Sequence, residues 1–242
     1  MQEHLLSHYN ERQTPIDMLV LHATCHADAG EVFACLDKLA LSCHYFVDLN
    51  GNITRMVAEQ NRAWHAGVGY WRGIDTDLNS HSIGIEIGNL SLGQQAFTEA
   101  QIEKLIPFCR KLIKKYNLDP RRIVAHSDIA PTRKPDPGIC FPWKRLAREG
   151  IGLWYQPRNA EKIDIENPAE LLHLIGYDTR DEEKTIASAY AFRRRFLPEE
   201  VAADPDIEQL VNNVYPVGQH ELLQGKKFIR ALKAVAYSYT RP

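Results

Sequence analysis

The sequence has no excess of charge and no long hydrophobic run. Its 29 basic and 31 acidic residues leave a net charge of −2, so electrostatics gives no general attraction to nucleic acid or to an anionic membrane. Every apolar run is far shorter than the roughly 18 residues that a transmembrane helix needs. Residues 1–15 lack the basic start and the apolar stretch of a signal peptide. We therefore expect no integral membrane segment and no nucleic-acid partner.

Cysteine is scarce and shows no paired spacing. An odd number of cysteines without a CxxC motif argues against a disulfide framework and favours a reducing compartment. We therefore expect a cytoplasmic protein, with the periplasm or cell envelope as the alternative if an export signal has been trimmed. The cysteines, which we expect to be small buried side chains, are Cys25, Cys35, Cys43, Cys109 and Cys140.

What remains is the composition of an ordinary globular protein. With 242 residues, 44% of them hydrophobic, the chain is long enough for one large domain or for a domain with a small appendage. The element order over residues 1–157 predicts an α/β domain, a mixed β-sheet flanked by helices. The expected elements are strands at 16–22, 82–88 and 121–126, helices at 30–41, 98–117 and 142–149, and a hairpin at Asn50-Gly51. Thr98 and Gln101 predict a capping box, and Pro107 predicts a kink in the same helix.

The last third of the chain has a different pattern. Residues 157–167 indicate a linker, and helical spacing follows at 168–175, 181–196, 206–213 and 220–237. We expect a small helical domain over residues 165–242, with Arg193 to Arg195 on a solvated helix face. Because the candidate catalytic residues precede residue 150, we expect this domain to be dispensable for cleaving small substrates.

Two predicted strands end at histidines, His22 and His126, and Asp136 follows ten residues after the second. The ends of sheet strands are where α/β folds build sites, and two histidines with one carboxylate are a common set of ligands for catalytic zinc. The alternative is that both histidines are structural. Lys134 and Asp136 each precede a proline, which holds them extended, so their side chains should point the same way. A lysine there could stabilise an oxyanion; the alternative is a surface salt bridge.

Glu86 lies in the strictly alternating strand 82–88, on the face opposite its isoleucines. Gly84 and Gly88 are its neighbours on that face and should leave room for a ligand or water, so Glu86 is a candidate general base. It could instead be a solvated residue. The stretch AWHAGVGYW at 63–71 is rich in aromatic residues, which suits a carbohydrate or peptide groove or a cap on the core.

Five segments carry a resemblance to a known family. In chain order over about residues 15–150 they are LVLHATCHAD, SCHYFVDLNG, AEQNRAWHAG, NSHSIGIEIGN and IVAHSDIAPTRKPDPGICFPW. They resemble the zinc-dependent N-acetylmuramoyl-L-alanine amidases of the AmiD/AmpD type, which share their fold with peptidoglycan recognition proteins. The C-terminal helices resemble, more loosely, a peptidoglycan-binding module.

The resemblance implies a role for each matching residue. It places Zn²⁺ on His22, His126 and Asp136, with Glu86 as the catalytic glutamate and Lys134 as the lysine that stabilises the transition state. It also implies a substrate cleft lined by His44, Trp64 and His65. In related branches a catalytic tyrosine stands where this chain has Cys43, which favours Glu86 as the base.

The implied reaction is hydrolysis of the amide between N-acetylmuramic acid, in its ordinary or 1,6-anhydro form, and L-alanine of a peptidoglycan stem peptide. One rival is a non-catalytic peptidoglycan-binding protein, which would need none of these acids and bases. Another is a zinc peptidase that acts on ordinary peptides.

Overall fold

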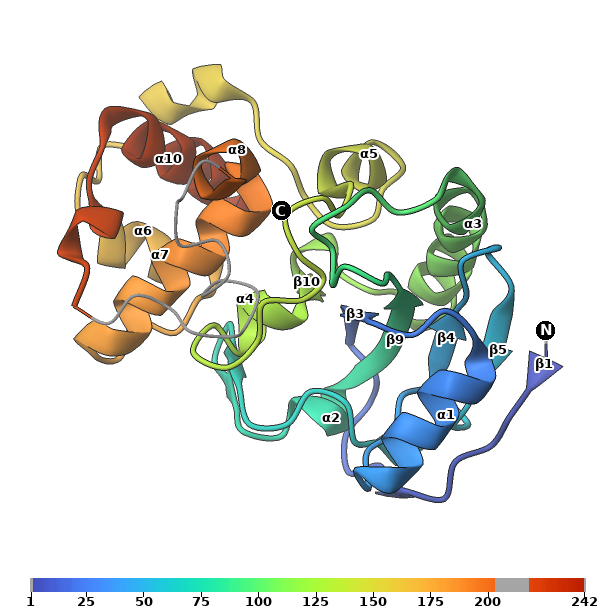
Figure 1. Ribbon diagram of the computed structural model, residues 1–242. Helices are drawn as coiled ribbons and strands as arrows, with labels where there is room; N and C mark the ends of the chain where they lie inside the picture. The colour runs from blue at the N-terminus through green and yellow to red at the C-terminus, as the bar shows by residue number, and fades with distance from the viewer. Residues whose placement is uncertain (1, 203–217, 242) are drawn as a thin grey trace.

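The computed structural model describes residues 2–202 and 218–241 and has a six-stranded mixed sheet at its centre (Figure 1). The strand order is β1-β5-β4-β9-β3-β10, and the three pairs from β4 to β10 are parallel. The strands are β1 (Gln2–Glu3), β5 (Ile53–Arg55), β4 (Tyr45–Val47), β9 (Ser82–Gly88), β3 (Met18–Thr24) and β10 (Ile123–Ala125). Two small antiparallel ribbons pair β2 (Tyr9–Glu11) with β6 (Asn61–Ala63) and β7 (Tyr70–Trp71) with β8 (Ile74–Asp75).

Helices cover both faces of this sheet. The α-helices are α1 (Ala29–Lys38), α2 (Leu78–His81), α3 (Glu99–Tyr116), α4 (His126–Ile129), α5 (Trp143–Arg148), α6 (Pro168–Ile175), α7 (Glu182–Phe196), α8 (Pro198–Ala202) and α10 (Lys226–Thr240). Short 3₁₀ turns are η1 (Pro120–Arg122), η2 (Pro157–Lys162) and η3 (His220–Leu223). None of the helices in the described part of the chain is long and apolar enough to cross a membrane.

Local signals in the sequence explain where several elements begin and end. The predicted capping box of α3 is confirmed: the Gln101 amide donates to Thr98 Oγ1 at 3.1 Å, and Gln101 Oε1 accepts from the Thr98 amide at 3.0 Å. This helix continues through Pro107 and ends at Tyr116, and the next residue, Asn117, caps it in the left-handed conformation. The predicted hairpin is also confirmed, with Gly51 at φ +81° in the turn between β4 and β5.

One face of the sheet packs against α3 and α5. Alternation in β9 places Ile83, Ile85 and Ile87 on this face, where all three are fully buried together with Leu19 and Leu21 of β3. The alternate residues of β3 and β9, including His22 and Glu86, therefore lie on the second face.

The second face shares a hydrophobic core with the C-terminal helices. Met18 and Val20 of β3 and Val124 of β10 belong to one buried cluster with Phe192 of α7 and Leu232 of α10. The expected linker is instead largely ordered, because η2 packs against α10. The division into residues 1–157 and 165–242 stays a prediction about folding units, but the two regions bury their apolar surface against each other.

The prediction that Arg193 to Arg195 lie on a solvated face is wrong, since Arg194 is 5% exposed and Arg195 is 3% exposed. Their helix packs against α4, and Arg195 contacts Asp128 of that helix and the ring of Trp143, so this face is buried instead of meeting water. The helix expected at 206–213 lies outside the described residues.

Candidate active site

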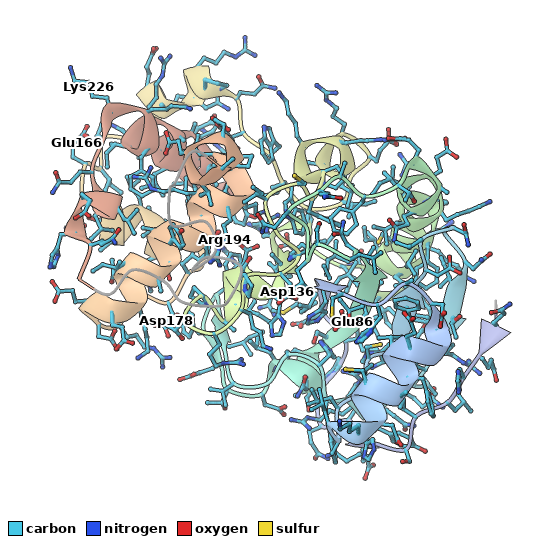
Figure 2. The ribbon with its side chains drawn as sticks, in the orientation of Figure 1. Glu86, Asp136, Glu166, Asp178, Arg194 and Lys226 are labelled. Carbon is cyan, nitrogen blue, oxygen red and sulfur yellow. The ribbon has the colours of Figure 1, made fainter. Side chains whose placement is uncertain are left out.

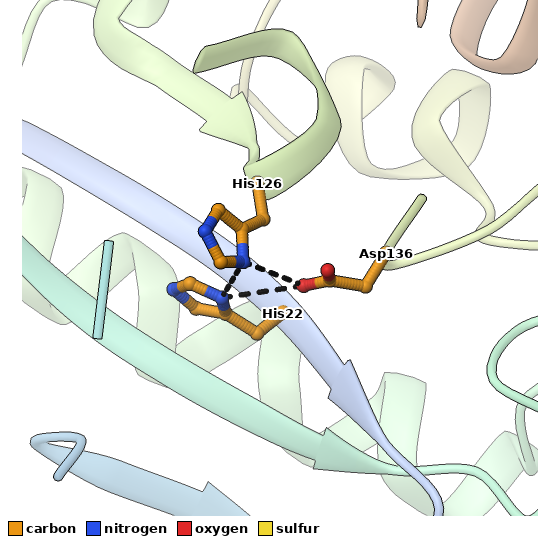
Figure 3. A group of neighbouring side chains, drawn as sticks. All are labelled: His22, His126 and Asp136. Atoms are coloured by element: carbon orange, nitrogen blue, oxygen red, sulfur yellow. Dashed lines mark hydrogen bonds and ion pairs between the residues drawn. The ribbon is translucent and has the colours of Figure 1, made fainter. Parts of the chain in front are cut away.

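Three buried side chains converge where β3 and β10 end (Figure 3). His22 Nδ1 lies 2.9 Å from His126 Nδ1 and 3.3 Å from Asp136 Oδ2, and His126 Nδ1 lies 3.1 Å from the same oxygen. β3 carries His22, and α4 begins at His126 directly after the neighbouring strand. The parallel pairing of β3 with β10 thus brings together two histidines that are 104 residues apart.

Hydrogen bonds behind the histidines fix which ring nitrogen carries the proton. His126 Nε2 lies 3.1 Å from the carbonyl oxygen of Ala66, so Nε2 carries the proton and donates it to that oxygen. Nδ1 is then unprotonated and has a free lone pair. His22 Nε2 lies 3.0 Å from His65 Nδ1, and His65 Nε2 lies 3.2 Å from Ser82 Oγ.

The direction of the hydrogen bonds that run from His22 through His65 to Ser82 follows from the bond that the Ser82 hydroxyl makes. The Ser82 hydroxyl donates to the carbonyl of Leu78 at 2.6 Å, so it accepts from His65 Nε2. His65 Nδ1 must then accept from His22 Nε2, which leaves the lone pair of His22 Nδ1 facing His126 and Asp136. Two imidazole lone pairs and a carboxylate therefore meet with no hydrogen atom between them.

Such a group of acceptors suits a bound cation. Two histidine nitrogens and one carboxylate oxygen are a common ligand set for catalytic zinc, with a further position for water or substrate. Burial, reinforced by the neighbouring His126, lowers the pKa of His22 to about 4, so its ring is neutral near pH 7. The side chains present therefore fit a divalent metal ion.

Glu86 lies beside this group because β9 is paired in register with β3. Glu86 is the direct cross-strand partner of His22, and its Oε1 lies 3.9 Å from His22 Nδ1. Its Oε2 is buried and has no hydrogen-bond partner among the described residues. Burial raises the pKa of Glu86 to about 8, Asp136 adds to this effect, and Lys134 opposes it. A buried carboxylate with an uncommitted oxygen next to a metal site is suited to accept a proton from water.

Lys134 and Asp136 come from the same loop, after α4 (Figure 2 labels Asp136 and Glu86 at the centre of the molecule). Lys134 is half-buried, and its ammonium group is near enough to favour the charged form of Glu86.

The space expected beside Glu86 is not free. A Cβ atom added to Gly84 would lie 2.4 Å from Cγ of His65, so the ring of His65 fills the position that the missing side chain leaves. A Cβ atom at Gly88 would lie 2.7 Å from the carbonyl oxygen of His26. The expectation of room at both glycines is therefore wrong: one is filled by the ring that supports His22, and the other by backbone.

The three residues expected to line a substrate cleft differ in their surroundings. His44 is fully buried; its Nδ1 accepts from the Gly84 amide and its Nε2 lies 3.1 Å from the Asn61 carbonyl, so both ring nitrogens are engaged within the protein. Both ring nitrogens of His65 are engaged too, as described above. Trp64 is half-buried, and its indole nitrogen donates to Asn10 Oδ1 at 2.7 Å. A role in substrate binding stays a prediction for all three.

Sequence reasoning missed Ser82 and Asp128, which stand behind the histidines. Ser82 has no recognisable signal, because its role depends on the fold bringing His65 next to β9. Asp128 does have one: it lies three residues after Ala125 and its Oδ2 accepts from the Ala125 amide at 2.9 Å, closing the N-terminus of α4.

Comparison with known proteins identifies the family. A family model described as N-acetylmuramoyl-L-alanine amidase matches residues 12–139, which contain all the residues of the candidate site. The chain belongs to the N-acetylmuramoyl-L-alanine amidase family. The amidase AmiD of Escherichia coli (strain K12) is 37% identical over 223 residues, covering 80% of this chain and 79% of AmiD. The 1,6-anhydro-N-acetylmuramyl-L-alanine amidase AmpD of Enterobacter cloacae is 40% identical over 123 residues, covering 51% of this chain and 64% of AmpD.

Solved structures of this family match most of the chain. A complex of E. coli AmiD with the substrate anhydro-N-acetylmuramic acid-L-Ala-D-γ-Glu-L-Lys aligns with a TM-score of 0.72 and 32% identity, covering 94% of this chain and 91% of that one. AmpDh3 of Pseudomonas aeruginosa aligns with a TM-score of 0.74 and 29% identity, covering 98% and 96%. The predicted α/β fold with C-terminal helices is confirmed. The chain is an N-acetylmuramoyl-L-alanine amidase, and the rival readings as a binding module or an ordinary peptidase are set aside.

Proposed function

We propose that this amidase is zinc-dependent and that His22, His126 and Asp136 are the zinc ligands. The observation that carries the proposal is the convergence of two imidazole lone pairs and a carboxylate oxygen in a buried position, with both imidazoles held from behind by hydrogen bonds. Zinc in a site with three protein ligands supplies Lewis-acid chemistry, lowering the pKa of water and polarising a carbonyl group.

Glu86 acts as the general base and then as the general acid. Its uncommitted Oε2 accepts the proton of the attacking water, and the same carboxyl then donates a proton to the leaving amino group of L-alanine. Its raised pKa in the metal-free protein means that the surroundings already favour the protonated form that the second step requires.

Lys134 stabilises the negative charge that develops on the carbonyl oxygen of the scissile amide. A cationic group that is already in place when the oxyanion forms lowers the barrier without reorganisation. The ammonium group is near enough to Glu86 and His22 to act on the charge of both, which supports this role.

The substrate that we propose is an anhydro-muropeptide. Two solved relatives are complexes with such ligands: AmiD of E. coli with anhydro-N-acetylmuramic acid-L-Ala-D-γ-Glu-L-Lys and AmpDh3 of P. aeruginosa with anhydromuramic pentapeptide. The two structures cover 94% and 86% of this chain.

Mass spectrometry of muropeptides tests the reaction and the cofactor together. Protein loaded with one equivalent of zinc should release the stem peptide from an anhydro-muropeptide, and removing the metal with a chelator should stop the release. Cleavage at full rate by protein shown to be metal-free would overturn the zinc assignment. The same preparation is also given intact murein sacculi. Faster cleavage of sacculi than of the soluble anhydro-muropeptide would contradict the proposed substrate.

A further inference from the structure

Asp128 connects the segment that bears His126 to the C-terminal helices. It is fully buried in α4, where its Oδ2 accepts from the amide of Ala125, the residue before His126. The same oxygen accepts from Arg195 Nη1 of α7, and the other carboxylate oxygen accepts from the hydroxyl of Tyr177 at 2.7 Å. Each of these last two partners lies about fifty residues or more further along the chain, beyond the residues 12–139 that match the family model.

Arg195 is itself held in one position. Its side chain is 1% exposed, and its guanidinium lies 4.0 Å from the centre of the Trp143 ring. Its Nη2 donates to the carbonyl of Ile123 in β10 at 3.3 Å. One guanidinium therefore contacts both the strand before His126 and the helix that begins there. A planar guanidinium with fixed donors suits such a double contact better than a flexible ammonium group does.

The neighbouring arginine reaches the loop that bears the other proposed groups. Arg194 Nη1 lies 3.4 Å from the carbonyl of Lys134, two residues before Asp136. Figure 2 shows Arg194 on α7 on the side of that helix toward Asp136. Two consecutive residues of α7 thus contact the two segments that carry His126 and Asp136.

We propose that Arg195 is a positioning residue of the active site: through its ion pair with Asp128 it holds α4, and with it His126, in the orientation that metal binding needs. The C-terminal helices are then part of the structure that shapes the site, in addition to any role in binding peptidoglycan. The proposal rests on the zinc site proposed above. An apolar replacement of Arg195 leaves the Asp128 carboxylate buried without its cation, and α4 should then relax away from the position seen here.

The test compares two arginines of the same helix. Arg195→Met should weaken zinc binding about tenfold, the lower end of what is lost with outer partners of metal ligands. It should also change the visible spectrum of the cobalt-substituted protein, which reports the arrangement of the ligands. Arg193→Met is the matched control, because Arg193 pairs with Glu200 and the carbonyl of Leu222, which lie within the C-terminal helices. Arg193→Met should lower the melting temperature yet keep the wild-type zinc affinity and cobalt spectrum.

Unchanged zinc affinity in folded Arg195→Met would overturn the proposal. If that variant does not fold, the double variant Asp128→Asn/Arg195→Met, which leaves neither charge unpaired, takes its place and should show the same loss. If neither variant folds, Tyr177→Phe is measured instead, since it removes only the hydroxyl bonded to Asp128. A smaller but measurable loss of zinc affinity in this variant supports the proposal, and an unchanged zinc affinity overturns it.

Failure of the zinc site itself can be told apart from failure of this proposal. Wild-type protein that binds no zinc refutes the metal assignment. Hydrogen exchange at the amides of residues 125–128 in metal-free protein then tests Arg195 alone, and Arg195→Met should accelerate it where Arg193→Met does not. Equal exchange in the two variants would refute a positioning role.

Discussion

At the scale of the residue, the side chains of the site differ in which of their polar atoms hydrogen-bond within the protein and which do not. His22 and His126 each use one ring nitrogen for support within the protein and present the other to the proposed metal. Glu86 has an oxygen that is buried and without a hydrogen-bond partner in the described residues, which is costly in a folded protein unless a ligand uses it. The chemistry therefore depends on atoms that the fold leaves uncommitted.

Glu86→Gln should retain zinc and substrate binding but lose turnover by about 10²- to 10⁴-fold, because an amide cannot accept the proton. Zinc content, KM and kcat measure these effects. Glu59→Gln is a control, since Glu59 is a partly buried carboxylate that binds Tyr45, Tyr116 and Lys115 outside the site. Near wild-type kcat in Glu86→Gln would move the base to another group.

Asp136→Ala and Lys134→Ala should differ although the two residues are neighbours in one loop. Asp136→Ala removes an anionic ligand, so zinc affinity should fall steeply and activity with it. Lys134→Ala should keep zinc and lower kcat by about 10²- to 10³-fold with little change in KM, because its contact strengthens as charge develops on the carbonyl oxygen. If the pair were only a salt bridge bracing the loop, both variants would show the same modest loss of stability, which parallel measurements of zinc content, melting temperature and kcat would reveal.

At the scale of the element, the site depends on how β9 meets its neighbours. The pairing of β9 with β3 places Glu86 opposite His22, and the absence of a side chain at Gly84 lets the segment that bears His65 approach the strand. A one-residue shift in this pairing would send Glu86 to the opposite face of the sheet, away from His22. The strand therefore fixes the relation between the proposed base and the proposed ligands.

Gly84→Ala should displace His65, because the added Cβ would lie 2.4 Å from its ring. We expect a loss of about 1–3 kcal/mol in the free energy of unfolding and a weaker zinc affinity, since His22 loses the partner that fixes its protonated nitrogen. Gly88→Ala is the matched control in the same strand, where the added Cβ would meet the His26 carbonyl instead. Equal zinc affinities in the two variants, measured by competition with a chelator, would show that His65 does not support His22.

At the scale of the whole molecule, the C-terminal helices complete the hydrophobic core. Met18 and Val20 of the central strand are fully buried, and their cluster includes residues of α6, α7 and α10. Of the five cysteines expected to be buried, Cys43 and Cys109 are buried, whereas Cys25 and Cys140 are exposed, so that expectation is wrong for these two. The helices thus contribute to the stability of the domain that carries the site.

A fragment of residues 1–160 should fail to form a stable native structure. This reverses the expectation from sequence that residues 165–242 are dispensable on small substrates, because removal would expose the apolar face around Val20 and leave Asp128 without Tyr177 and Arg195. Circular dichroism and thermal unfolding of the fragment measure this. A fragment that unfolds cooperatively and cleaves small muropeptides at the wild-type rate would show that the two regions are independent.

Local patterns in the sequence are enough to predict the main elements of the α/β region and the candidate residues of the site. The alternation of β9, the capping box of α3 and the hairpin at Asn50-Gly51 depend on residues close together in the chain, so local physics predicts them. The motif around His126 and Asp136 is likewise local, and with His22 and Glu86 it carried the resemblance to the amidase family.

How these elements pack against one another depends on contacts between residues that are far apart in the chain. The register that sets Glu86 opposite His22, the placement of His65 in the space over Gly84, and the burial of Arg195 against Asp128 join residues that are between 19 and 67 positions apart. Sequence patterns show which side chains alternate or repeat within one element, but they do not show which elements become neighbours. For that reason Arg195 resembles part of a solvated charge run in the sequence, whereas the packing of α7 makes it a buried partner of the helix that begins at His126.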